Sequence, residues 1–134
     1  MKKILSAFAI LAFFSVSFTA CKKEKAKTAS EQIIGTWQIK TVVYNDHFDN
    51  LDHTITTSSF TANDTYEFKK DGTVYANIQG QSDSSTYTIA GENKLTITDD
   101  ATYDIKTLDG HTLVLYVKSI SGSDFEEATI TFNR

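Results

Sequence analysis

The chain has 134 residues, of which 40% are hydrophobic, and its 13 Lys+Arg and 17 Asp+Glu give a formal net charge of −4. This length and hydrophobic content fit a single packed domain and exclude wholesale disorder. A net negative chain also lacks the clustered basic residues that neutralise phosphates, so we expect no nucleic-acid partner.

The first 20 residues predict an export signal. Residues 1–3 are a short basic start, residues 4–18 are an apolar run, and small residues precede Cys21, the only cysteine. This is the layout of a secretory signal peptide. The apolar run is shorter than the ~20 residues that span a bilayer.

The residues around Cys21 resemble a bacterial lipobox, Phe18-Thr19-Ala20-Cys21. The resemblance implies cleavage after Ala20 and a diacylglyceryl thioether on Cys21. Each buried CH₂ of an acyl chain contributes ~0.8 kcal/mol, so two or more chains anchor a protein stably. The alternative is an ordinary signal peptide that leaves Cys21 with a free thiol.

Residues 21–32 are expected to form a solvated tether, because they are charged or small with almost no large apolar side chain. Six of the 13 basic and two of the 17 acidic residues precede Gln32, so the remainder carries 15 acidic and seven basic residues, a net charge of −8. That charge favours solubility and disfavours acidic partners.

Residues 33–134 read as one antiparallel β domain. Apolar residues alternate with polar ones along eight or nine short runs, of which residues 51–60 show the weakest alternation. Asp71-Gly72 and Asp109-Gly110 separate such runs and predict hairpin turns. The pattern predicts an all-β fold: a single antiparallel up-and-down β-barrel of about eight strands.

The alternating residues of these runs define the expected barrel interior and the candidate ligand-binding residues. They are Ile39, Thr41, Val43, Tyr66, Phe68, Val74, Ile78, Tyr87, Ile89, Leu95, Ile97, Tyr103, Ile105, Leu113, Leu115 and Val117, with Ile130 and Phe132 on the same face. A barrel of eight strands is wide enough either to be filled by side chains or to hold one small ligand. The sequence leaves both alternatives open, and a single β-bulge would shift the phase of a strand.

The head of the first run, Ile34-Gly35-Thr36-Trp37, resembles the Gly-x-Trp signature of lipocalins. Together with the later runs at residues 66–75, 87–89, 93–97, 103–105 and 130–134, it is similar to the lipocalin-like domain lipoproteins of Bacteroidetes-type bacteria. The resemblance implies a barrel floor built from Gly35, Trp37 and Arg134, in which Arg134 either packs on the Trp37 ring or frays into solvent. It also implies an exported protein that is lipid-anchored at Cys21 to the bacterial outer membrane, on the periplasmic face or the cell surface.

The stretch from His47 to His53 is the most site-like segment, with two histidines, Asp49 and Asp52. Imidazole and carboxylate groups are suitable metal ligands, but their spacing here matches no metal template, so we predict no metal. On the lipocalin resemblance, this stretch falls in or beside the first long loop, which lies over the open end of the barrel. It would gate a ligand there, with Phe48 and Leu51 as the hydrophobic contacts.

The sequence does not support catalysis. It has no Gly-x-Ser-x-Gly elbow and no glycine-rich phosphate loop, and His111 directly follows a hairpin glycine. Asp99-Asp100 and Glu126-Glu127 are adjacent pairs, and neighbours in a strand point to opposite faces, so we expect no acid/base dyad. The prediction is therefore a protein that is not an enzyme and needs no cofactor.

Two functions follow as expectations. The first is binding of a small apolar molecule inside the barrel. The alternative is an envelope interaction module with a filled core that binds a protein or glycan partner through its outer face and loops. Tyr44, Tyr75 and Tyr116, expected on the outside, motivate the alternative because tyrosine is enriched in binding surfaces.

Overall fold

The computed structural model describes residues 25–134. The predicted signal peptide and Cys21 lie outside the described residues. Within residues 25–134, no helix has the length and apolar character needed to cross a membrane.

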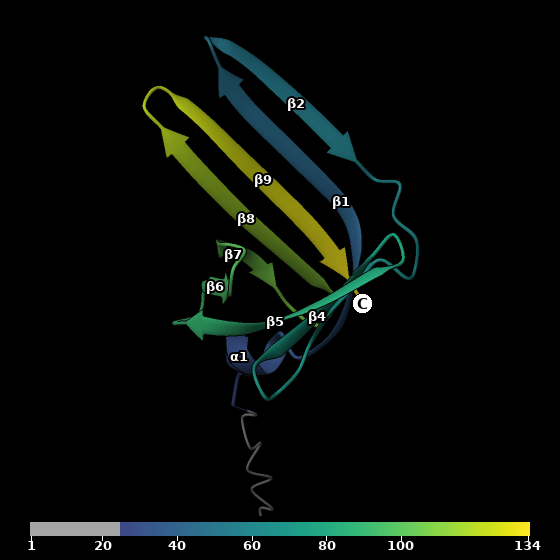
Figure 1. The fold of residues 1–134 in the computed structure, drawn as a ribbon. Helices are drawn as coiled ribbons and strands as arrows, with labels where there is room; N and C mark the ends of the chain where they lie inside the picture. Colours follow the sequence, from purple (N-terminus) through teal and green to yellow (C-terminus); the bar gives the residue numbers. More distant parts are fainter. Residues whose placement is uncertain (1–24) are drawn as a thin grey trace, which may run out of the picture.

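The described chain forms one short helix and nine strands joined in a single sheet (Figure 1). In chain order they are α1 (Ala29–Gln32), β1 (Gly35–Phe48), β2 (Leu51–Thr57), β3 (Thr65–Phe68), β4 (Thr73–Ile78), β5 (Gln81–Ala90), β6 (Lys94–Ile97), β7 (Thr102–Leu108), β8 (Thr112–Ser121) and β9 (Asp124–Asn133). Strands β3 to β9 pair antiparallel in sequence order, and β1 pairs with both β3 and β9, which closes the barrel. The predicted all-β, eight-stranded up-and-down barrel is confirmed, with β2 as an additional strand.

β2 lies beside the second half of β1. The edge of β1 that pairs with β3 through residues 35–38 pairs with β2 through residues 42–48. Strands β2, β1, β9 and β8 therefore continue past the shorter strands as a four-stranded extension, which Figure 1 shows rising from one side of the barrel.

Residues 47–53, expected in or beside a long loop over the barrel mouth, form a β-hairpin of this extension, so they do not form a loop there. Asp49 and Asn50 have φ of 51° and 63° and form the tight turn between β1 and β2. Aspartate and asparagine tolerate this left-handed conformation, which two-residue hairpin turns require. The flanking residues then pair across the hairpin, His47 with Asp52 and Phe48 with Leu51.

A β-bulge in β1 changes which residues face the core. The register with β9 shifts between Ile39 and Thr41. Ile39 is buried, and beyond the shift Val42 packs against the core. The prediction that Thr41 and Val43 face the barrel interior is therefore wrong, because one extra residue in a strand reverses its alternation.

The half of the barrel next to α1 is filled by side chains. Its fully buried members are Ile33, Trp37, Phe68, Leu95, Leu113, Leu115 and Phe132. Phe68 packs edge to face on Tyr87, with 5.0 Å between ring centroids, an orientation that aromatic rings favour.

Helix α1 closes the floor of the barrel. Thr28 caps it, since its side chain accepts from the Glu31 backbone N–H while the Glu31 carboxylate accepts from the Thr28 backbone N–H. Ala29 and Ile33 are buried. The folded domain thus begins at about residue 28, and the tether expected to reach residue 32 is shorter than predicted.

Arg134 seals the same floor. Its guanidinium lies 4.1 Å from the centroid of the Trp37 ring. Nε donates to the carbonyl of Gly110 at 3.1 Å, and Nη1 and Nη2 donate to those of Ile34 and Gln32 at 2.9 and 3.0 Å. Gly35 has a φ of 125°, and a Cβ there would approach Arg134 Nη1 to 3.1 Å, which explains the absence of a side chain.

Candidate functional site: a pocket at the open end of the barrel

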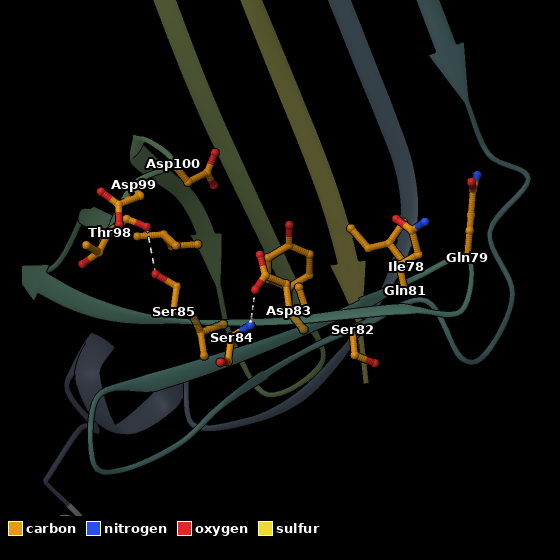
Figure 2. Close-up of a pocket in the computed structure, with 14 residues that line it drawn as sticks. Ile78, Gln79, Gln81, Ser82, Asp83, Ser84, Ser85, Thr98, Asp99 and Asp100 are labelled. Carbon is orange, nitrogen blue, oxygen red and sulfur yellow. Dashed lines mark hydrogen bonds between the residues drawn. The ribbon is translucent and has the colours of Figure 1, made fainter.

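A pocket of about 930 Å³ lies at the end of the barrel that carries the β4–β5 and β6–β7 turns, opposite α1. Its walls come from β3, β4, the first half of β5 and the turn between β6 and β7 (Figure 2). Ligand pockets commonly measure ~300–1,000 Å³, so this one is large enough for a small organic molecule.

One side of the pocket is apolar. The alternation of β4 places Val74, Ala76 and Ile78 on one face, and Tyr66 lies directly across from Ala76 on β3. Val74 and Ile97 are buried core residues, so the bottom of the pocket is the top of the packed core.

The other side is polar and acidic. Asp83 and Ser85 of β5 are the strand partners of Ala76 and Val74, and therefore share their face. Asp99 and Asp100 approach from the β6–β7 turn (Figure 2). Ser85 Oγ donates to the Thr98 carbonyl at 2.8 Å, which ties β5 to this turn.

Two tyrosines adjoin these carboxylates. The Tyr103 hydroxyl donates to Asp100 Oδ2 at 2.8 Å, and burial followed by this contact raises the pKa of Tyr103 far above its usual value. Burial, and then the charge of Asp100, also raises the pKa of Tyr66. Both hydroxyls therefore remain protonated at neutral pH.

The buried carboxylate of Asp64 fixes the rim of the pocket. Asp64 is 3% exposed, and its oxygens accept from the backbone N–H of Gln79 at 2.6 Å and from the backbone N–H and hydroxyl of Thr61 at 2.6 and 2.9 Å. These hydrogen bonds lower the pKa of Asp64. The clamp joins the β2–β3 loop to the β4–β5 turn, where Gln79 has a φ of 53°.

Only part of the predicted ligand-binding set reaches this pocket: Tyr66, Val74, Ile78 and Ile97. The other predicted residues that face the interior belong to the packed core or lie against it. Seven are buried, namely Ile39, Phe68, Leu95, Tyr103, Ile105, Leu113 and Leu115, while Tyr87, Ile89 and Val117 are half-buried beside them. The barrel is therefore filled by side chains at one end and has a pocket at the other.

The acidic residues of the pocket were missed. Asp99 and Asp100 were expected to alternate across a strand, but β6 ends at Ile97 and Asp99 has a φ of 60° in the following turn. Both therefore line the same pocket. A turn signal at Asp99-Asp100 was the one feature of the sequence that pointed to this arrangement.

The histidines of the β1–β2 hairpin do not form a joint site. His47 Nδ1 lies 2.5 Å from Asp52 Oδ1, and His53 Nδ1 lies 3.0 Å from Asp46 Oδ1. Strand alternation puts these pairs on opposite faces of the hairpin. Among residues 25–134, no three potential ligands come together around a common point.

Of the three tyrosines expected on the outside, only Tyr75 is exposed, at 48%. Tyr116 is half-buried, and its hydroxyl donates to Glu127 Oε2 at 2.7 Å while Lys106 Nζ lies 4.7 Å from its ring. Tyr44 is also half-buried and follows Val42 on the inner face of β1. The prediction that Tyr44 lies on the outside is therefore wrong. Tyr116 lies on the outer face of β8, because its neighbour Leu115 points inward, but it is partly covered there.

A small antiparallel up-and-down barrel with a plugged floor and a pocket at its mouth is an architecture that can enclose one small molecule. The profile of the lipocalin-like domain matches residues 33–115, and the chain belongs to this family. No curated protein matches the chain significantly.

Proposed function

We propose that this protein binds a small apolar molecule in the pocket at the open end of its barrel and catalyses no reaction. The pocket of about 930 Å³ carries the proposal, because its apolar side merges with the packed core and its mouth is open for entry. Membership of the lipocalin-like domain family supports it.

A filling substitution tests this function. Ala76 lies in the middle of β4 on the pocket face, whereas its neighbour Tyr75 points to the outer face and is exposed. Ala76→Trp should fill the pocket, and Tyr75→Trp is the matched control for a new indole on the same strand.

The probe is N-phenyl-1-naphthylamine, a neutral apolar dye that fluoresces in apolar surroundings. We expect saturable one-to-one binding to the wild type and to Tyr75→Trp, and at least a tenfold loss in Ala76→Trp. Dye that binds to the acyl chains of the lipid anchor, and not to the pocket, would still bind to the Ala76→Trp variant. Equal binding by all three proteins, or no binding at all, would overturn the proposal.

We further propose that Cys21 anchors the protein to the outer membrane. The folded domain starts at the closed end, where α1 lies, and the pocket is at the other end, beside the β4–β5 and β6–β7 turns. A tether that enters at α1 would point the mouth away from the anchoring membrane. Metabolic labelling with an alkyne palmitate should mark the wild type and not Cys21→Ala, and equal labelling would refute the anchor.

A second candidate function is protein or glycan binding at the four-stranded extension. It is favoured by the exposure of Phe48, Leu51, Ile55 and Ile120 there, each between 58% and 69%. Crosslinking in intact envelopes should then capture a partner that is lost in Leu51→Ser/Ile55→Ser, and capture that is unaffected by these substitutions would count against it.

A further inference from the structure

The pocket has two chemically distinct sides, and this bears on what it binds. The cavity itself, with an apolar side that continues into the core, marks the site. Its acidic side then sets the charge that a bound head group can carry. This charge preference rests on the proposed ligand-binding function.

Three carboxylates face the pocket, from Asp83 on β5 and from Asp99 and Asp100 on the β6–β7 turn. No basic side chain lines the pocket among residues 25–134. Within this described part, none of the three forms an ion pair. The negative charge on this side is therefore uncompensated.

These carboxylates also keep acceptor capacity for a ligand. Asp83 Oδ1 accepts from the Ser84 backbone N–H at 2.8 Å, and Asp100 Oδ2 accepts from the Tyr103 hydroxyl at 2.8 Å. These contacts orient the carboxylates and use one oxygen of each. A carboxylate can accept several hydrogen bonds, so the second oxygens are available to a donor.

We propose that the pocket selects an amphipathic ligand with a protonated amine head and an apolar body, and rejects ligands with an anionic head. The body lies on Val74, Ala76 and Ile78, and the ammonium group lies among Asp83, Asp99 and Asp100. Charge-assisted hydrogen bonds to carboxylates favour the ammonium. An anionic head meets three like charges in a domain that is itself net negative.

Displacement of N-phenyl-1-naphthylamine by three ligands with the same tail tests the proposal: decylamine, decanol and decanoate. We expect decylamine to displace the dye at a concentration at least tenfold lower than decanoate, with decanol in between. The preference should shrink as salt is added, because salt screens interactions between accessible charges.

In the variant Asp83→Asn/Asp99→Asn/Asp100→Asn, decylamine should no longer displace the dye at a lower concentration than decanoate. The control variant Asp49→Asn/Asp124→Asn/Glu126→Gln removes the same number of charges from the hairpin tips of the extension and should keep the order. Retention of the order in the pocket variant, or its loss in the control, would overturn the proposal.

The two proposals fail in different ways. If the dye does not bind the wild type, the proposed function fails. If the dye binds and the three ligands displace it equally, or decanoate displaces it best, only the charge preference is wrong.

Discussion

Replacing Arg134 by alanine should destabilise the protein more than the replacement of an exposed residue usually does. The substitution removes three hydrogen bonds from the guanidinium to the carbonyls of Gln32, Ile34 and Gly110 and its stacking on Trp37. At a solvent-accessible site, each hydrogen bond contributes about 0.5–1 kcal/mol and the cation–π contact a further ~0.5–1 kcal/mol. The expected loss is therefore about 2–4 kcal/mol, or roughly 8–16 °C in Tm for a domain of this size.

Urea unfolding of the wild type, Arg134→Ala and Arg134→Lys measures this effect. The midpoint of the alanine variant should fall without a change in slope, which reports stability alone. Lysine keeps the charge over Trp37 but lacks the planar fork that reaches three carbonyls, so it should recover less than half of the loss. A loss below ~0.5 kcal/mol in the alanine variant is the value of an ordinary surface substitution and would refute a sealed floor.

Three further predictions concern glycine geometry and pH. Gly35→Ala should cost about 1–3 kcal/mol in urea unfolding because φ is 125° and its Cβ would meet Arg134, whereas Gly110→Ala, with open space at its Cβ, should stay within ~0.5 kcal/mol of the wild type. Hydrogen bonds lower the pKa of Asp64, so its carboxylate stabilises the fold fully above the unfolded pKa of 3.8, and this stabilisation fades as pH falls through the lower native pKa. The difference in urea midpoint between the wild type and Asp64→Asn should therefore disappear in acid. A difference that stays constant with pH would contradict the clamp. Burial raises the pKa of Tyr103 above 10.0, so the unfolded chain loses this proton first and stability should fall above about pH 10. Between pH 8 and pH 10.5, the urea midpoint should fall less in Tyr103→Phe than in the wild type. An equal fall in both proteins would contradict the burial of Tyr103.

The sequence predicts the filled half of the barrel well and the hollow half poorly. Apolar alternation identifies residues such as Phe68, Leu95 and Leu113 because a packed interior requires it. The polar side of the pocket breaks that alternation: Asp83 lies in the run Gln81-Ser82-Asp83-Ser84-Ser85, and only its pairing with Ala76 shows that it faces inward.

Two local features of the structure could not be predicted from the sequence. No glycine or proline marks the bulge after Ile39. The bulge turns Val42 toward the barrel interior, whereas Thr41 and Val43 were expected to face it. Asp64 resembles any polar loop residue, since its partner Gln79 is 15 residues away and is brought close only by the fold. Both depend on tertiary pairing, which alternation within one strand does not report.

The most direct test of the central claim is native mass spectrometry of the protein before and after incubation with a lipid and metabolite extract of the native cells. The account predicts a discrete added mass, released on denaturation, that Tyr75→Trp retains and Ala76→Trp lacks. An unchanged mass in the wild type would contradict ligand binding and move the search to partners of the four-stranded extension.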